Sequence, residues 1–473
     1  MGHIKPLVFV AMPFGKRKDI STGVEIDFDH IYTSAIQPAA ESLGLEVMRG
    51  DEERTGGIIM RPVFERLLLA EIVIADLTMQ NPNVFYELGV RHAARPRSTI
   101  LMYAQNARLP FDVAMIRAVP YDLEDGDLTD ASKQNLTDAL TEKLKEAVHK
   151  SEDVDSPLSQ LIPEFPYISL PHEVTDTFKD RVVGISTVKD QIFRACAVKN
   201  EVAALEILQN IEAEVGALTD TNAELYVDLL LAYRDVKSWG DMVRVCELFP
   251  PETARQIPAI IEQRAFALNR RNDEGDRDVA LRNLETLISK YGDNPETCGL
   301  IGRIYKDRYE EAAGLCLDDD DLEPALLMLR ADDALPRGYL GNAIEWYERG
   351  FLSDPRDFYP GINEATLRHI RGDDEDQEKL NDLLPALSFT VARLGGMKSK
   401  DYWVVATTLE LSVLREHWDI VERTLEKILA LGAYDWMLET TAKNLHLIKE
   451  VRKLRGEDIS QLHPIILRLN PTA

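Results

Sequence analysis

The chain has 473 residues, of which 45% are hydrophobic and 29% charged, and its formal net charge is −27. These proportions are those of an ordinary globular protein, and the length leaves room for about three domains. Because binding to nucleic acid requires basic surface, the charge argues against a nucleic-acid partner, and no apolar run approaches the roughly 18 residues that a membrane-spanning helix needs.

The negative charge lies almost entirely after residue 120. Residues 1–120 carry 13 basic and 14 acidic side chains, whereas the remainder carries 41 and 67. A nearly neutral N-terminal domain is able to hold a small anionic nucleotide. The acidic runs at 318–321 and 373–376 indicate solvated loops. The four cysteines show no paired or zinc-finger spacing, so we expect reduced cysteines in a cytoplasmic protein, with no metal and no cofactor.

Residues 6–122 alternate between strand-like and helix-like segments. The apolar runs predict strands at 7–14, 45–51, 72–78, 99–104 and 118–122. Helical spacing predicts helices at 28–44, 56–71 and 83–95. Continuous apolar strands that alternate with helices favour a parallel sheet covered on both faces. Ligands of such sheets bind beyond the C-terminal ends of the strands, here at Met12–Phe14, Arg49–Asp51 and Asp76–Thr78.

The rest of the chain is predicted to be helical. Residues 130–152 indicate a helix that closes the first domain, and 156–171 have the proline density of a linker. From about residue 185 the pattern is helix after helix. The sequence therefore predicts an α/β domain at 1–128, a closing helix and linker at 129–184, and an all-α domain at 185–473.

Degenerate repeats occur in the helical region. "IGRIY" at 301–305 matches the L-G-x-x-Y core of a tetratricopeptide repeat, and "AIEWYERGFLSDP" at 343–355 matches its second half. The segments 229–250 and 408–429 share an apolar helix, a tryptophan and a second apolar helix. These spacings favour a helical-repeat array, and the alternative is an unrelated helical bundle.

Glu87 is the first candidate for a functional role. Asn81 precedes proline, so a helix starts at or just after Pro82, and the helix dipole should keep Glu87 ionised. The alternative is an ion pair between Glu87 and Arg91 on a solvent-exposed face. Gly89 removes bulk beside Glu87.

Asp76 is the second candidate, at the C-terminal tip of the strand at 72–78. Its alternative role is to accept hydrogen bonds from the loop that follows. Two carboxylates that converge on one sugar are the machinery of glycosidic cleavage. An ionised Glu87 suits the nucleophilic or the charge-stabilising role, and Asp76 would assist the leaving group or orient the sugar. Thr78, Asn81 and Asn83 would supply hydrogen bonds.

These segments carry a resemblance. "FVAMPFG", "ADLTMQNPNVFYELG" and "LPFD" at 109–112 resemble the nucleoside deoxyribosyltransferase-like family, whose flavodoxin-like sheet is related in layout to TIR domains. The resemblance implies that Glu87 is the nucleophile, that Asp76 binds the sugar, and that Ala11, Pro13 and Phe14 line the pocket. Met12 and Asp51 join them as strand-end residues. The basic residues 16–18 indicate either a phosphate contact or, more simply, a solvated turn.

A second resemblance covers residues from about 185 to 470. The segment "GNAIEWYERGFLSDPRDFYPGINEATL" is similar to the TRAF-binding helical region of apoptosis signal-regulating kinases. The printed sequence contains no kinase signature of the H-R-D or D-F-G type. The resemblance implies a signalling or defence protein in which the repeats bind protein partners.

The combined prediction is an N-glycoside hydrolase or deoxyribosyltransferase-like enzyme fused to a protein-binding helical array. The small-molecule ligand is predicted to be a nucleoside, a nucleotide or NAD, and a homo-oligomer is possible. One alternative is a TIR-like NAD glycohydrolase. The other is a scaffold that binds a nucleotide without turning it over.

Overall fold

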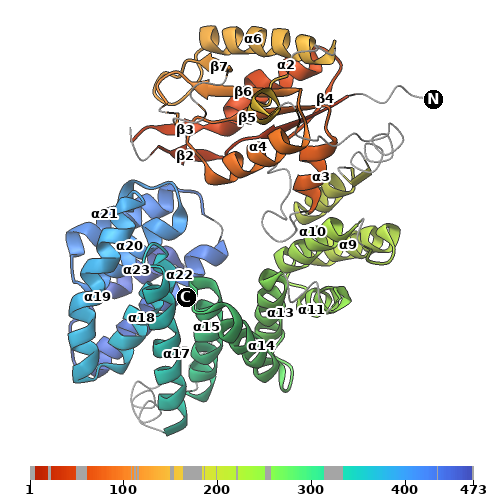
Figure 1. The fold of residues 1–473 in the computed structure, drawn as a ribbon. Coiled ribbons are helices and arrows are strands. Elements are labelled where there is room, and N and C mark those ends of the chain that lie inside the picture. The colour runs from red at the N-terminus through yellow and green to blue at the C-terminus, as the bar shows by residue number, and fades with distance from the viewer. Residues whose placement is uncertain are drawn as a thin grey trace. The chain divides into compact units, whose positions relative to one another are not determined.

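The chain forms two compact units, Met1–Asp241 and Met242–Ala473 (Figure 1). The computed structural model describes residues 6–19, 23–49, 61–107, 109–110, 113, 117–149, 154–162, 164, 184–185, 187–198, 200–219, 222–250, 257–313, 334–433 and 435–470. The predicted order of an α/β region followed by an all-α region is confirmed.

A parallel sheet forms the centre of the N-terminal unit. Its strands lie in the order β4 (Glu46–Arg49), β1 (Leu7–Ala11), β5 (Ile72–Asp76), β6 (Thr99–Ala104) and β7 (Ala118–Tyr121). All neighbouring strands are parallel. If the five strands are numbered by their order in the chain, leaving out β2 and β3, the sheet has the 2-1-3-4-5 order of a doubly wound sheet. In such sheets ligands bind at the C-terminal ends of the strands.

Helices cover both faces of this sheet, because successive side chains of a strand point to opposite faces. On β1, Val8 and Val10 join a core with the helical run 28–41 (α1, Phe28–Ile31; η1, Tyr32–Ile36; α2, Gln37–Glu41) and with α6 (Asp130–Val148). Leu7 and Phe9 join the opposite core with α3 (Arg61–Leu69) and α4 (Pro82–Ala94). Figure 1 shows α4 and α6 on opposite sides of the strands.

One hairpin was not expected from the sequence. The basic residues that were predicted as a solvated turn form β2 (Lys16–Lys18), which pairs antiparallel with β3 (Glu25–Asp27). Lys16 makes an ion pair with Asp27 at 3.0 Å. The opposite charges of the two short strands therefore stabilise a hairpin where the sequence alone indicates only a run of like charge.

The first helices after the linker belong to the N-terminal unit. They include the helical residues 187–196, α9 (Glu201–Val215) and α10 (Ala223–Asp235). The buried Arg66 of α3 contacts Glu224 of α10 at 3.3 Å, and Lys189 contacts the same carboxylate at 3.0 Å. This ion cluster ties α10 to the sheet domain.

The C-terminal unit is a succession of helices, and most consecutive helices pack on each other. Glycines let neighbouring helices of this unit approach closely. A Cβ at Gly302 would lie 3.0 Å from the Tyr347 ring, and one at Gly361 would lie 2.5 Å from Leu387. In chain order the helices are α11 (Trp239–Leu248), α13 (Pro258–Arg271), α14 (Asp276–Tyr291), α15 (Pro295–Ala312), α17 (Ala334–Ser353), α18 (Phe358–Arg371), α19 (Asp374–Arg393), α20 (Tyr402–Leu414), α21 (Trp418–Ala430), α22 (Asp435–Leu454) and α23 (Leu462–Leu469).

The acidic run at 373–376 is not a solvated loop as predicted. Asp373 caps α19, and Asp376 is fully buried with two hydrogen bonds from Arg371. Acidic residues stabilise a helix N-terminus, which explains the run. The other acidic run, 318–321, lies outside the described residues. Within the described part of the chain, no helix has both the length and the apolar character needed to cross a membrane.

Candidate functional site

Asp76 lies in a closed hydrogen-bond network at the C-terminal end of the sheet. Its side chain is fully buried. Oδ1 accepts hydrogen bonds from the backbone N–H of Thr78 at 2.9 Å and from its hydroxyl at 2.5 Å, and Oδ2 accepts one from the Tyr121 hydroxyl at 2.8 Å. Thr78 Oγ1 also accepts the N–H of Ala104 at 2.9 Å. Asp76 and Thr78 thus join the ends of β5, β6 and β7.

Burial raises the pKa of Asp76 above its ordinary value, and the hydrogen bonds from Thr78 and Tyr121 act against that rise. Both carboxylate oxygens are occupied within the protein. The geometry matches the alternative that the sequence left open, in which a strand-tip aspartate accepts hydrogen bonds from the loop that follows.

Asn81 and Pro82 start α4 as predicted. The Asn81 side chain accepts a hydrogen bond from the N–H of Asn83 at 2.9 Å, and Pro82 occupies the first turn. Both asparagines therefore take part in the helix cap, which satisfies one of the free N–H groups at the helix start.

Glu87 is half-buried on α4 and has no hydrogen-bond or ion-pair partner among the residues that the structure describes. Burial raises its pKa to about 7. Burial therefore acts against the ionised carboxylate that the helix dipole favours, since the effect of the dipole is limited to the first turn.

Arg91 does not pair with Glu87, because its side chain points into the protein. Its Nη1 donates to the carbonyls of Leu67 and Ala70 at 2.8 and 2.9 Å. Its Nη2 donates to the carbonyls of Glu71, Arg97 and Ser98 at 3.1–3.5 Å. The side chain is 1% exposed. Sequence reasoning missed this role, since an arginine four residues after a glutamate is equally compatible with a surface ion pair.

The remaining predicted residues divide by exposure. Phe14 is 48% exposed, with the Arg17 guanidinium 5.0 Å from its ring centre. Asn83 and Gly89 are also exposed, whereas Ala11, Met12 and Pro13 are buried. Asp51 lies outside the described residues. The segments that follow β1 and β5 lie at the same edge because Ala11 pairs with Ala75, which brings Phe14 and the start of α4 to that edge.

Glu87→Gln should stabilise the protein, and the gain should grow with pH. Because the pKa of Glu87 in the folded protein lies above that of the unfolded chain, folding stability is lost as pH rises from about 4.5 to about 7. Glutamine removes this loss, so we expect a gain of about 1–3 kcal/mol at pH 8 and a smaller one near pH 5.5. Thermal unfolding at both pH values measures it. Glu142→Gln, at an exposed position of α6, should change neither, and an equal gain at both pH values would contradict the assignment.

Comparison with known proteins identifies the family. The family model for the MAP3K TRAFs-binding domain matches residues 84–466. Mitogen-activated protein kinase kinase kinase nsy-1 of Caenorhabditis elegans is 32% identical over 46% of this chain and 14% of its own length. Human mitogen-activated protein kinase kinase kinases 5 and 6 are 23% and 25% identical over 84% and 81% of this chain, and 28% and 29% of their own lengths.

These relatives correct the predicted activity. They are named as protein kinases and not as N-glycoside hydrolases or deoxyribosyltransferases. The prediction of glycosidic cleavage, including its NAD glycohydrolase form, is therefore wrong. This chain spans less than a third of the length of the relatives above, whereas the family model covers most of the chain. The chain belongs to the MAP3K TRAFs-binding domain family.

Proposed function

We propose that this chain is a non-catalytic regulatory module of a MAP3K-type signalling protein, and that its helical repeats bind a TRAF-type protein. The observation that carries the proposal is the family match over residues 84–466, which runs from within α4 to within α23. Helical repeats suit this role because stacked helix pairs present an extended surface to a partner.

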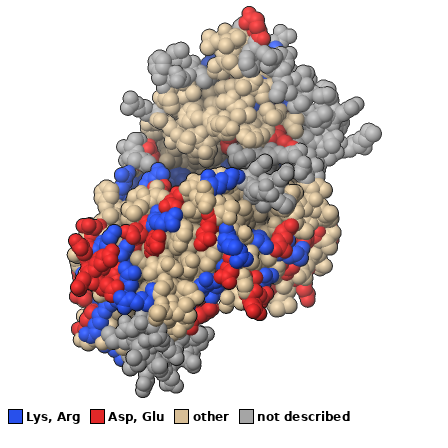
Figure 2. All heavy atoms as spheres, turned by 60° about the horizontal axis from the view of Figure 1, so that its bottom comes forward, with Lys and Arg blue, Asp and Glu red and all other residues tan. Residues whose placement is uncertain are grey.

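The surface of the repeats supports a protein partner. On the face shown in Figure 2, acidic and basic side chains are interspersed over the helical repeats. Large apolar side chains also reach the surface of this unit: Leu352 on α17 is 68% exposed and Phe389 on α19 is 66% exposed. Mixed charge with exposed apolar side chains is the usual composition of a protein interface.

Titration of the purified chain with recombinant TRAF proteins tests the proposal by isothermal calorimetry. We expect saturable binding to at least one of them. Leu352→Ser and Phe389→Ser should together weaken it at least tenfold, whereas Tyr86→Ser, at a comparably exposed position of the N-terminal unit (58% exposed), should not. An absence of binding up to about 100 μM, which corresponds to an affinity weaker than about −5.5 kcal/mol, would overturn it.

A nucleoside or nucleotide that binds without being turned over stays a second proposal, for the N-terminal unit alone. It is supported by the position of Phe14 and the first turns of α4 at one edge of the sheet, and by the unpartnered Glu87 among the described residues. The thermal-unfolding experiment on Glu87→Gln extends to it directly. A nucleotide or NAD that raises the melting temperature of the unmodified chain, and not of the variant, would support it.

A further inference from the structure

Helix α22 packs on helices beyond its neighbours in the stack of helices. In a repeat array each helix contacts the helices adjacent to it in the stack. α22 packs on α23, which follows it in the chain, and on α20 of the preceding helix pair, as an array requires, and it also packs on α18. Lys306 of α15 also reaches it. The helix therefore turns back across helices that precede it by as much as three helix pairs.

One side chain of α22 connects two of these helices. The Oδ1 atom of Asn444 accepts a hydrogen bond from Lys306 of α15 at 3.3 Å, and Nδ2 donates one to Glu410 of α20 at 3.2 Å. Lys306 is 3% exposed and Glu410 is 6% exposed. The amide of Asn444 thus lies between a buried ammonium group and a buried carboxyl group and makes a hydrogen bond with each of them.

Apolar side chains on two faces of α22 flank this amide. Leu445 and Ile448 pack in a core with α20, α21 and α23. Leu447 and Val451 pack in a second core with α15, α17 and α18. Just beyond the helix, Arg455 donates to the carbonyls of His369 and Ile370 at 2.8 and 3.2 Å, at the end of α18.

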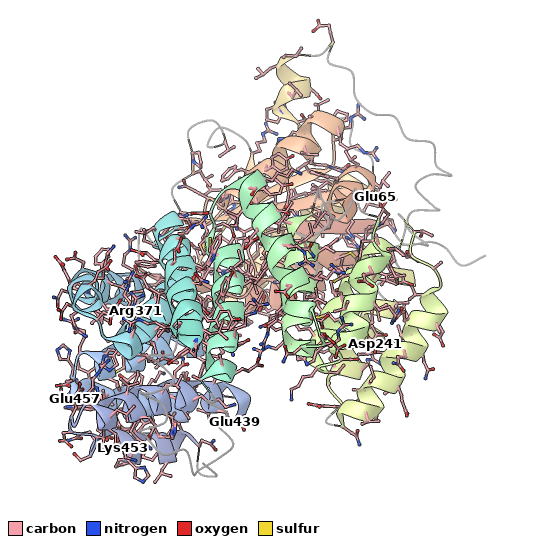
Figure 3. All side chains as sticks on the ribbon, turned by 90° about the horizontal axis from the view of Figure 1, so that it is seen from below. Glu65, Asp241, Arg371, Glu439, Lys453 and Glu457 are labelled. Carbon is pink, nitrogen blue, oxygen red and sulfur yellow. The ribbon has the colours of Figure 1, made fainter. Side chains whose placement is uncertain are left out.

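The burial of α18 also indicates that other helices cover it. An outer helix of an array exposes one polar face, whereas residues 360–368 of α18 are all buried. In Figure 3, Glu439 and Lys453 mark the two ends of α22, and Arg371 marks the end of α18. We use the term inner groove for the surface of α15, α18 and α20 that contacts α22.

We propose that the inner groove is a binding site for an amphipathic helix that carries one amide between apolar positions, that α22 occupies it within the same chain, and that a partner helix of the same chemistry takes its place. The inference rests on the proposed protein-binding function and specifies the chemistry of the partner segment. A polar seam in an otherwise apolar interface specifies register at a cost in stability, as a site with an exchangeable occupant requires.

The covalent connection of α22 to α21 explains why α22, and not a separate helix, occupies the inner groove. The connection between α21 and α22 is short, and a short linker gives a tethered segment an effective concentration in the millimolar range. A free helix of similar affinity competes poorly against it. Weakening α22 alone should therefore open the groove to a helix added in solution.

The test uses the full chain and a fluorescent peptide of residues 435–454. In the variant Asn444→Asp, Lys306 still pairs with the new side chain, but Glu410 loses its donor and faces a second carboxylate. Because burial raises the pKa of Glu410 to about 7, both groups are charged above that pH, which disfavours the bound state of α22. We expect this variant to bind the unmodified peptide at least ten times more tightly than the unmodified chain does, by fluorescence anisotropy. Lys443→Gln is the matched control, because it changes the charge equally at the neighbouring exposed position; it should behave as the unmodified chain does.

Hydrogen exchange provides the second measurement, and Asn444→Ala provides a milder variant if Asn444→Asp does not fold. Amides of α22 should exchange at least tenfold faster in either variant, while those of α15 and α17 keep their rates. Equal peptide binding by all chains, or exchange of α22 only together with the whole unit, would overturn the proposal. The peptide assay contains no TRAF protein, so its failure is distinct from a failure of TRAF binding.

Discussion

Replacing Arg91 with alanine should destabilise the N-terminal unit by at least about 3 kcal/mol, because the loss of a buried donor group leaves its acceptors without hydrogen bonds. Five backbone carbonyls accept from this one guanidinium. They belong to the end of α3 and to the segments that precede β5 and β6. The carbonyls at a helix C-terminus have no partner within the helix, so Arg91 supplies the bonds that hold the end of α3 against the sheet.

Thermal unfolding measures this effect, and a loss of about 3 kcal/mol corresponds to a decrease of roughly 6–12 °C for a unit of this size. The melting temperature of Arg91→Lys should lie between that of the unmodified chain and that of Arg91→Ala. A single ammonium group replaces the planar guanidinium and reaches fewer carbonyls. Arg97→Ala is the control, because the Arg97 side chain is exposed. If Arg97→Ala lowered the melting temperature as much as Arg91→Ala does, the role assigned to Arg91 would be wrong.

The sheet could be predicted from the sequence because its signals are local. Apolar runs bounded by turn residues marked β1 and β5, and Asn81-Pro82 marked the start of α4. The direction of the Arg91 side chain is not a local property. It depends on where α3 ends in space, and the i, i+4 spacing from Glu87 fits either direction equally well.

The raised pKa of Glu87 could not be predicted for the same reason. The helix dipole is readable from the sequence, whereas the burial that raises the pKa to about 7 comes from neighbours in the fold. Asp76 shows the limit for function: a carboxylate at a strand tip fits a sugar-binding site and a hydrogen-bond network alike. Its partner Tyr121 lies 45 residues away in the chain, and the kinase relatives overturned the enzymatic interpretation.

The succession of helices was visible in the sequence because apolar residues at helical spacing and matches to a helical-repeat motif are local signals. The packing of α22 on the earlier helices could not be predicted, since the 3.6-residue periodicity of a helix indicates which of its faces is buried and not which helix covers that face. α22 is apolar on more than one face, and this breadth is the signal that was available for a helix packed between two cores.

Replacing Arg368 with methionine should give the largest loss in the C-terminal unit. The Arg368 side chain is 2% exposed, and it donates to Glu364 at 2.7 Å, to Asp376 at 3.1 Å and to Glu348 at 2.9 Å. These carboxylates come from α17, α18 and α19, so one cation joins three helices. Methionine keeps the aliphatic volume but leaves the buried Glu364 carboxylate without its partner, whereas Asp376 keeps Arg371 and Glu348 keeps Lys379. An unpaired buried carboxylate costs about 3–5 kcal/mol at pH 8.

The pH dependence separates this loss from a loss of packing. Burial already raises the pKa of Glu364 to about 7, although the Arg368 guanidinium opposes the rise. Without the cation the pKa rises further above that of the unfolded chain, so the variant loses stability as pH rises and recovers it when Glu364 binds a proton. Arg368→Met should therefore be destabilised much less near pH 5.5 than at pH 8, in urea unfolding monitored by circular dichroism.

Two further variants decide whether the carboxylates carry the cost. Adding Glu364→Gln to Arg368→Met should restore part of the stability at pH 8, because it removes the buried charge that the first substitution leaves unpaired. Arg356→Met, at a position whose side chain is 90% exposed, should have little effect at either pH. A loss that is equal at both pH values and unchanged in the double variant would show that Arg368 acts through packing and not through its charge.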